Sequence, residues 1–386
     1  MAVGLMTDEE LFGRLIAFDT TSSRSTGPIT DFLSDYLGAA GCEVQAYPYA
    51  DGEKVNLVAW AGPQTDGGII LGGHLDVVPA AEPDWASDPF ELTRRDDAYY
   101  ARGSTDMKGA VALAVNAVAR LRTDELVRPA ALLLTSDEEL GTLGAQAFVK
   151  SWDNRFPLPA EAVIGEPTEL RVVRMHKGHL TVRLTITGRP AHSGCPRLGL
   201  SAIEPAADLV VVLRELRRTL EGERNEQSVF FSECPHPVLN VGMIRGGTAV
   251  NMVPDRCVLE IGVRLLPGQT TDAFLERFAA HLASAGDLPH ERLGWEVVND
   301  SAPMLCPEDS RLYRELSALV SQTESYGVSY ASDAGPLQQL GIQSVLWGPG
   351  RIEDAHRANE SVFVEQFVRG GDLLGQFLRR RCTGAA

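Results

Sequence analysis

Two patterns of hydrophobic and polar residues follow one another along the chain. In the first, short apolar runs end abruptly in polar residues, as in residues 130–139 (AALLLTSDEE) and 160–169 (AEAVIGEPTE). Such runs are typical of strands that are buried on both faces of a sheet. Segments with apolar residues at helical spacing lie between these runs, as in residues 105–122. Strands alternating with helices predict an α/β domain, with a mostly parallel sheet and helices on both faces.

The second pattern begins near residue 179 and predicts an inserted domain. Residues 179–188 (HLTVRLTITG) alternate polar and apolar side chains, which is typical of a sheet with one solvated face. Strand, helix, strand, strand and helix signals follow in that order, which predicts an α+β, ferredoxin-like layer. The expected domains are therefore 1–178 joined with 293–386, and 179–292 between them, and a chain of 386 residues is long enough for two domains.

Helix signals also mark both ends of the chain. Thr7 followed by Glu10 is the pattern of a capping box and predicts a helix over residues 7–18. A last helix is expected from about Val364 to Arg381.

Composition narrows the function classes. A formal net charge of -17 argues against nucleic acid and against an anionic membrane surface as partners. We find no run of 18 apolar residues and no signal-peptide pattern, so we expect no membrane span and a cytoplasmic protein. The six cysteines lie far apart, which predicts reduced thiols, neither disulfides nor zinc ligands.

Polar residues recur at the ends of the predicted strands. His74 and Asp76 follow the run 69–71, residues 137–139 are three consecutive acids, and Glu166 ends the next run. Ligands of α/β sheets bind beyond the carboxyl ends of the strands. Asp106 lies just before a predicted helix and His356 follows a late strand, so both are further candidates.

Each of these features has an ordinary structural explanation when it is taken alone. A single His74 is more often a structural histidine than a ligand, and residues 137–139 could simply cap the next helix. When the features are considered together, these explanations are less convincing, because the polar residues recur where a parallel sheet places ligands. His74 and Asp76 also face the same side of an extended strand, so Asp76 could orient a metal-binding imidazole.

The candidate donors suit a pair of divalent cations. Two histidines and the carboxylates of Asp106, Glu139 and Glu166 are available, without sulfur. Clustered carboxylates raise one another's pKa unless a cation neutralises them. Imidazole and carboxylate donors suit zinc, although cobalt or manganese could fit. Glu138 would then be free to act as the general base.

Six motifs resemble, in order and over nearly the whole chain, the di-zinc amidohydrolase family. This family includes acetylornithine deacetylase, succinyl-diaminopimelate desuccinylase, aminoacylase and glutamate-releasing carboxypeptidases. The motifs are GGHLDVVP, ARGSTDMKGAVA, TSDEELGTLGA, IGEPTE, GRPAHSG and GPGRIEDAHRANE.

The resemblance implies a role for each candidate residue. Two Zn²⁺ ions per subunit, for which Co²⁺ could substitute, would share Asp106. The metal ligands would be His74, Asp106 and Glu166 for one ion, and Asp106, Glu139 and His356 for the other. Glu138 would be the general base and acid, and Asp76 would orient His74. The resemblance also implies a cis peptide bond between Asp106 and Met107.

The same resemblance implies that the inserted domain is a dimerisation lid. His192 would reach the partner subunit's site in a homodimer and stabilise the oxyanion. Asn251 and Arg264 would hold the substrate carboxylate, a task that suits the forked guanidinium group.

The substrate is implied only as a class, the small-molecule N-acyl amino acids. Further motifs, among them HKGH at 176–179, resemble the acetylornithine deacetylase branch, which releases ornithine and acetate. Ser332 and Asp333 are candidates for contacts with a basic substrate side chain, but they match neither of the two subfamily motifs expected here. Succinyl-diaminopimelate, acetylcitrulline and other N-acyl amino acids or dipeptides remain alternatives, as does a non-catalytic binding protein. The intact Glu138 and complete ligand set argue against the last.

Overall fold

The computed structural model describes residues 4–153, 157–284 and 290–384. The chain divides into two compact units, and the second is inserted in the first. The first unit contains residues 1–175, 305–326 and 332–386, and the second contains residues 176–304 and 327–331.

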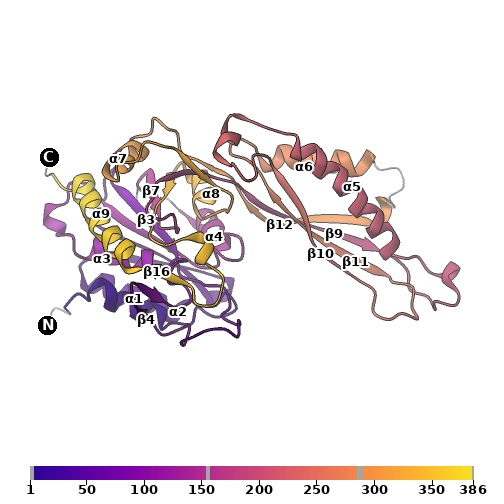
Figure 1. The fold of residues 1–386 in the computed structure, drawn as a ribbon, viewed down its shortest axis with the longest axis horizontal. Helices are drawn as coiled ribbons and strands as arrows, with labels where there is room; N and C mark the ends of the chain where they lie inside the picture. The colour runs from indigo at the N-terminus through magenta and orange to yellow at the C-terminus, as the bar shows by residue number, and fades with distance from the viewer. Residues whose placement is uncertain (1–3, 154–156, 285–289, 385–386) are drawn as a thin grey trace. The chain divides into compact units, whose positions relative to one another are not determined.

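A nine-stranded sheet forms the centre of the first unit, and its strand order is β1-β2-β6-β3-β7-β15-β8-β13, with β14 beside β8 (Figure 1). Its strands are β1 (Glu43–Tyr49), β2 (Lys54–Ala61), β3 (Ile69–His74), β6 (Ala130–Thr135), β7 (Glu161–Ile164), β8 (Val173–His176), β13 (Met304–Leu305), β14 (Tyr326–Val328) and β15 (Gln343–Leu346). The four central strands β6, β3, β7 and β15 run parallel, whereas β1, β2 and β8 pair in antiparallel fashion. A small sheet of β4 (Thr93–Arg95), β5 (Ala98–Tyr100) and β16 (Ser361–Phe363) lies apart from it.

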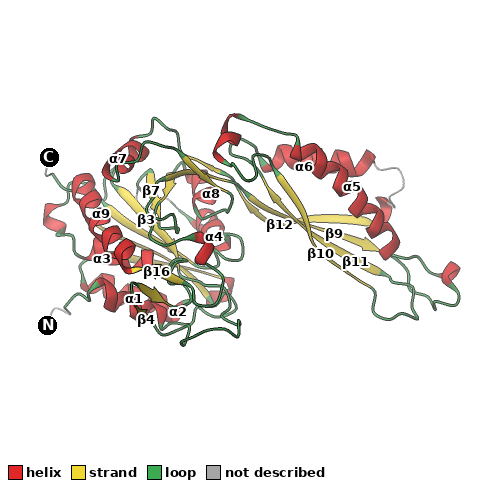
Figure 2. Cartoon of the chain, in the orientation of Figure 1, coloured by secondary structure: helices red, strands yellow, loops and turns green. Residues whose placement is uncertain are grey.

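Helices cover the large sheet, and every residue of β3 and β6 is buried as a result. The helices of this unit are α1 (Asp8–Ile16), α2 (Gly27–Ala39), α3 (Lys108–Ala119), α4 (Leu143–Ser151), α7 (Arg311–Leu319), α8 (Ala334–Leu337) and α9 (Val364–Cys382). Helix α3 packs against α1, α9 and β3, while α4 packs against α8 and β2 (Figure 2). The predicted capping box is present, because Thr7 Oγ1 accepts from the Glu10 main chain and Glu10 accepts from the Thr7 main chain.

The second unit is a four-stranded antiparallel sheet with two helices. Its elements are β9 (His179–Thr187), α5 (Ile203–Glu221), β10 (Val238–Gly246), β11 (Arg256–Arg264), α6 (Thr271–Ser284) and β12 (Leu293–Ser301). The strand order is β10-β11-β9-β12. Side chains of β9 alternate between buried and partly exposed positions, and the buried ones form a core with apolar residues of α5 and α6. This is the alternation that residues 179–188 predict.

The expected fold class is confirmed, a mostly parallel α/β core with an α+β insertion. The predicted boundary at residue 292 lies before β12, a strand that pairs with β9 in the sheet of the second unit. The second helix signal of the insertion spans residues 270–286 and corresponds to α6, and residues 285 and 286 lie outside the described part of the chain.

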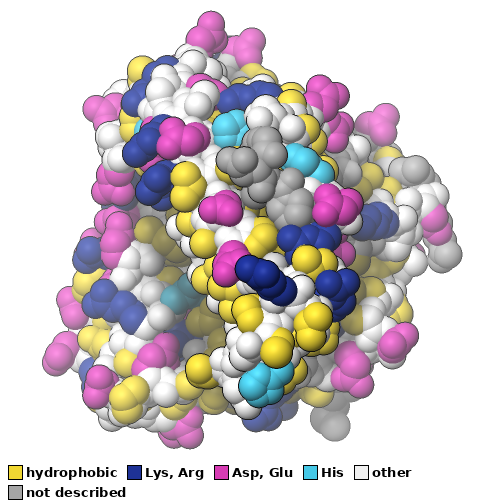
Figure 3. Space-filling model, turned by 90° about the vertical axis from the view of Figure 1, so that its right-hand side faces the viewer, with side chains coloured by type: hydrophobic (Ala, Val, Ile, Leu, Met, Phe, Trp, Pro, Cys, Tyr) yellow, Lys and Arg dark blue, Asp and Glu magenta, His cyan; other side chains and the backbone are white. Residues whose placement is uncertain are grey.

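Two surface properties bear on the partners. Among the described residues, no helix is both long and apolar enough to cross a membrane. On the face in Figure 3, acidic and basic side chains are interspersed with hydrophobic ones, so the negative charge of the chain does not gather there in one patch.

Candidate active site

The carboxyl ends of three parallel strands bring the predicted polar residues together. His74 is the last residue of β3 and lies in register with Thr135, the last residue of β6. On the other side of β3, Gly72 is in register with Ile164, the last residue of β7. The loops that follow these strands carry Asp76, the acids of residues 137–139, and Glu166, which are therefore neighbours in space.

Glycine before His74 permits a close approach of the loop that carries Asp106. A Cβ atom on Gly73 would lie 2.6 Å from Met107 Cε and 3.0 Å from Val111 Cγ2. Without a side chain at this position, Met107 and the first turn of α3 can pack directly on β3. The peptide bond between Asp106 and Met107 is cis, as the resemblance implies.

The Asp106 carboxylate lies between the two histidines. Its Oδ1 is 3.0 Å from His74 Nε2, and its Oδ2 is 3.2 Å from His356 Nε2. Burial alone would raise the pKa of Asp106, but hydrogen bonds from His356 and His74 hold the pKa well below its usual range. Each oxygen of one carboxylate therefore faces a different imidazole, which is the arrangement that a shared ligand of two ions requires.

Glu139 completes the contact with His356. The Nε2 atom of His356 is 3.0 Å from Glu139 Oε1. Ligand atoms of His74, Asp106 and Glu139 all lie within 4.8 Å of one another. His356 has a positive φ of 59°, a conformation uncommon for a residue with a side chain.

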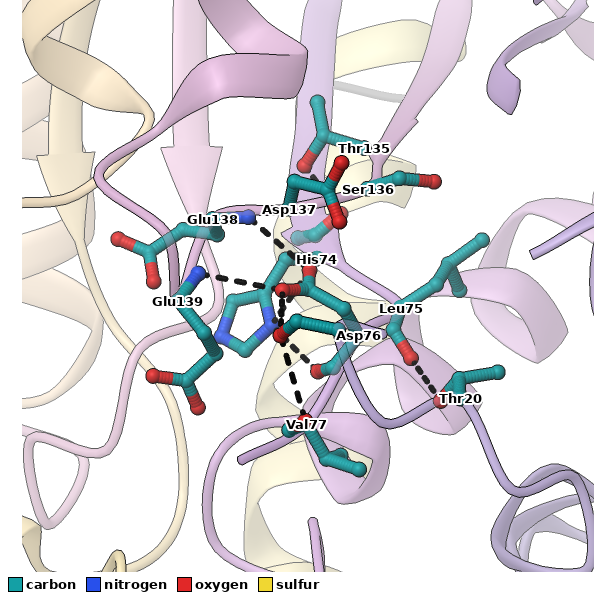
Figure 4. Close-up of polar contacts among 12 residues, drawn as sticks. Thr20, His74, Leu75, Asp76, Val77, Thr135, Ser136, Asp137, Glu138 and Glu139 are labelled. Atoms are coloured by element: carbon teal, nitrogen blue, oxygen red, sulfur yellow. Dashed lines mark hydrogen bonds and ion pairs between the residues drawn. The ribbon is translucent and has the colours of Figure 1, made fainter. Parts of the chain in front are cut away.

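Asp76 orients the site in a different way from the one expected. The nearest acceptor of His74 Nδ1 is the main-chain oxygen of Asp76, at 2.9 Å, whereas the carboxylate Oδ1 is 3.6 Å away. The carboxylate instead accepts hydrogen bonds from the main-chain N–H groups of Glu138 and Glu139, at 3.0 and 3.2 Å (Figure 4). Asp76 thus fixes His74 through its main chain and fixes the acidic loop through its side chain.

The third acid of the loop, Asp137, has structural partners. Lys54 Nζ donates to its Oδ1 at 2.6 Å and Tyr49 Oη donates to its Oδ2 at 3.0 Å. Asp137 has a positive φ of 55°. Lys54 and Tyr49 were not among the predicted site residues, because they lie 83 and 88 residues before Asp137 and no motif marks them.

Among the described contacts, no hydrogen bond joins the carboxylate of Glu138 or Glu166 to another side chain. Burial raises the pKa of both carboxyl groups well above the usual range, although His74 opposes this rise in each. Among the neighbouring carboxylates, Glu166 raises the pKa of Glu138 further, and Asp106 raises that of Glu166. Glu166 is only 4% exposed, so its carboxylate is poorly hydrated, and the neighbouring acids repel one another.

The donor set therefore fits a pair of divalent cations. It offers two imidazoles, several carboxylates and a bridging Asp106, without sulfur. Cations would offset both the burial and the mutual repulsion that raise the carboxyl pKa values.

Ser332 and Asp333 lie inside the first unit. Ser332 is 0% exposed and Asp333 is 2% exposed. Asp333 Oδ2 accepts a hydrogen bond from Thr135, at the end of β6. Burial raises the pKa of Asp333 to about 6.

The candidates in the second unit lie on two adjacent segments and on β11. His192 pairs with Met252 in an isolated bridge, and Ser193 N donates to Asn251 O at 2.9 Å. His192 and Asn251 are both exposed. Arg264 ends β11, where it pairs in register with Val238 of β10.

Comparisons with known proteins agree with this geometry. Residues 70–380 match the model of peptidase family M20/M25/M40. The acetylornithine deacetylase of Pasteurella multocida is 33% identical over 97% of this chain and 98% of that protein, and the acetylornithine deacetylase of Proteus mirabilis is 34% identical over 99% and 98%.

Solved structures share the fold at low sequence identity. The M20 family metallo-carboxypeptidase Sso-CP2 of Sulfolobus solfataricus has a TM-score of 0.79 at 18% identity, over 97% of this chain and 99% of that one. The YXEP protein of Bacillus subtilis, described as a dinuclear metal-binding peptidase of the M20 family, has a TM-score of 0.63 at 14% identity, over 96% and 98%. With the family match over most of its length, this chain belongs to the M20/M25/M40 peptidase family and is a metallo-hydrolase.

Proposed function

We propose that the protein hydrolyses the amide bond of N-acyl amino acids with two bound metal ions, and that its substrate is N2-acetyl-L-ornithine. The observation that carries the two-metal proposal is the position of Asp106, with one oxygen toward His74 and the other toward His356. The similarity to two acetylornithine deacetylases supports the choice of substrate. The products would be L-ornithine and acetate, which places the reaction in arginine biosynthesis.

The proposed metal ligands divide into two sets that share Asp106. One ion would be held by His74, Asp106 and Glu166, and the other by Asp106, Glu139 and His356. Bound zinc would supply Lewis-acid polarisation of the amide carbonyl and a water of lowered pKa. Zinc is the proposed metal, and cobalt is a candidate substitute because the donors are imidazole and carboxylate.

Glu138 is the proposed general base and acid. Its carboxylate accepts a proton from the attacking water, whose oxygen forms the new bond to the acyl carbon. The same group then delivers that proton to the departing nitrogen as the C–N bond breaks. The raised pKa of Glu138 suits a group that must both accept and return a proton.

Residues of the second unit are proposed to bind the substrate. His192 would stabilise the developing oxyanion from the partner subunit, and Asn251 and Arg264 would hold the carboxylate of the amino acid. The unit would thus serve as a lid and dimerisation domain. Support for a homodimer comes from β10, an edge strand of its sheet with the exposed apolar side chains of Met243 and Ile244, because an unprotected apolar edge favours pairing. Sedimentation equilibrium would give the mass, and a monomer at assay concentrations would contradict this part.

Ser332 and Asp333 stay candidates for recognition of a basic side chain. Because both side chains are buried, they would act from the interior of the first unit. Asp333→Asn should raise KM for acetylornithine more than for acetylmethionine; equal effects would assign Asp333 a structural role.

A cytoplasmic location is proposed from the thiols. All six cysteines are free in the described chain, as expected in a reducing compartment.

The function is tested by an amide-release assay on zinc-loaded protein. N2-acetylornithine, acetylcitrulline, acetylmethionine and succinyl-diaminopimelate would be compared by kcat/KM. A tenfold preference for acetylornithine corresponds to about 1.4 kcal/mol of differential transition-state binding and would support the proposal. Preference for another substrate would retain the chemistry and reject acetylornithine.

Glu138→Gln distinguishes an enzyme from a binding protein. Loss of a general base lowers turnover by about 10²–10⁴-fold, while ligand binding would be retained. Glu125→Gln is the control, because Glu125 is exposed and, in the part of the chain that the structure describes, its ion pair is with Arg122 on the surface. Undiminished turnover in Glu138→Gln would exclude the assigned base.

A further inference from the structure

The N–H groups of the Asp106 loop are held by a carboxylate that is far away in sequence. Glu360 Oε1 accepts from the main-chain nitrogens of Thr105 and Asp106, at 2.9 and 3.0 Å. Glu360 is 1% exposed and precedes β16. It also lies four residues after His356, so one side chain links the loop of His356 to that of Asp106.

The other oxygen of Glu360 binds an arginine that is equally buried. Arg102 Nη1 lies 2.7 Å from Glu360 Oε2, and each side chain is 1% exposed. Arg102 follows β5 and lies four residues before Asp106. The ion pair therefore connects a residue before Asp106 with a residue after His356.

Arg102 also reaches the segment that follows His74 and Asp76. Its Nη2 donates to the main-chain oxygen of Pro79 at 3.1 Å and to Glu82 Oε1 at 2.7 Å. Its guanidinium carbon is 5.3 Å from the centre of the Trp85 ring. One guanidinium group thus contacts the loop after β3 and the carboxylate that holds the Asp106 loop.

We propose that Arg102 and Glu360 are positioning residues for the metal pair. Together they tie the loops of His74, Asp106 and His356 to one another and orient Asp106 before any metal binds. We call these two residues the Arg102–Glu360 clamp. This inference rests on the two-metal centre of the proposed function, but it does not depend on the substrate.

A buried ion pair by itself is weak support for such a role, because its desolvation cost can exceed its attraction. The main-chain contacts of the clamp carry the inference instead. Removal of a residue that hydrogen-bonds to a metal ligand commonly lowers metal affinity by about 10–100-fold. Asp106 faces both histidines, so a shift of its loop would weaken both ion sites together.

The test is zinc titration of Glu360→Gln by calorimetry, beside urea unfolding of the same metal-free protein. Glu161→Gln is the matched control. Glu161 also binds a buried arginine, Arg381, and a main-chain N–H, that of Leu312 at 3.2 Å. It lies at the start of β7, the end of the strand opposite to Glu166.

We expect Glu360→Gln to lower zinc affinity by about 10–100-fold and Glu161→Gln to leave it unchanged, even where both variants lose stability. Wild-type affinity in folded Glu360→Gln would overturn the proposal. So would an equal loss of affinity in Glu161→Gln, since the effect would then follow from general destabilisation.

A measurement on the wild-type protein covers the case in which Glu360→Gln does not fold. Amide hydrogen exchange of Thr105 and Asp106 in the metal-free protein should be slow, because Glu360 holds both N–H groups without a metal. Exchange as fast as that of exposed loops would overturn the clamp. If the wild-type protein itself binds no zinc, the proposed function fails, and this exchange result still decides whether Asp106 is positioned in advance.

Discussion

Asp76 Oδ1 accepts a hydrogen bond of 3.0 Å from the main-chain nitrogen of Glu138. A carboxylate two residues after the end of β3 therefore sets the position of the proposed general base on the neighbouring loop. Its second oxygen accepts from the next main-chain nitrogen, that of Glu139, a proposed metal ligand. A single buried side chain thus fixes both the base and a ligand.

The Asp76→Asn variant should therefore impair catalysis, although residue 76 is not proposed to contact the substrate. The amide offers one oxygen in place of two, so one of the N–H groups of residues 138 and 139 would face an NH₂ group. We expect kcat to fall by about 10–100-fold, as for other partners behind a metal site. Steady-state kinetics at saturating zinc measure this. An unchanged kcat would show that the loop holds its conformation without Asp76.

The strand ends could be predicted from the sequence because each buried run stops where its polar residues begin. His74, Glu139 and His356 were candidates on that ground, and Asp106 was a candidate because it lies just before a predicted helix. The structure brings the four together. The strand β12 was missed as part of the inserted domain, since most of its residues are exposed and its apolar pattern is weak.

Partners at long sequence separation could not be predicted. Lys54 is 83 residues from Asp137, and Asp106 is 254 residues from Glu360. Nothing local in the sequence specifies which charged side chains will meet after folding. The acceptor for His74 was also beyond sequence reasoning, because whether the main chain or the side chain of Asp76 binds the imidazole depends on the turn after β3.

Lys54 is expected to be important for stability. Its ammonium group binds Asp137 and the main-chain oxygen of Ser22, at 2.6 and 2.7 Å. Lys54→Met would leave Asp137, which is 5% exposed, without its cation. Breaking one side of a buried pair typically costs about 3–5 kcal/mol.

The double variant Lys54→Met/Asp137→Asn separates this effect from lost packing. It removes both charges, so urea unfolding should show a smaller loss than in Lys54→Met alone. Equal losses in the two proteins would mean that the uncompensated charge is not the cause.

Removal of metal should lower the stability of the first unit. The carboxylates of Glu138 and Glu166 have raised pKa values because of burial and their neighbours, and bound cations would relieve this. A ligand at 100 times its Kd stabilises the folded state by about 2.7 kcal/mol. Thermal unfolding with a chelator, and then with zinc restored, should show a lower and a recovered Tm. A Tm that does not respond to zinc would contradict the metal site.

The protein should lose stability in acid because of His176, the last residue of β8. Burial, and then the charge of Arg264, lower the pKa of His176 to about 4, whereas its ordinary value is 6.5. Between these values the unfolded chain binds more protons than the folded one, so the free energy of unfolding rises with pH from about 4 to about 6.5, by at most about 1.4 kcal/mol per pH unit for this group. His176→Gln should be less stable at pH 7, because the Nδ1 hydrogen bond to Lys177 O at 2.8 Å is lost, but it should show a flatter pH dependence. Urea unfolding followed by tryptophan fluorescence, at several pH values in this window, measures both effects; an unchanged slope would assign the acid sensitivity to other groups.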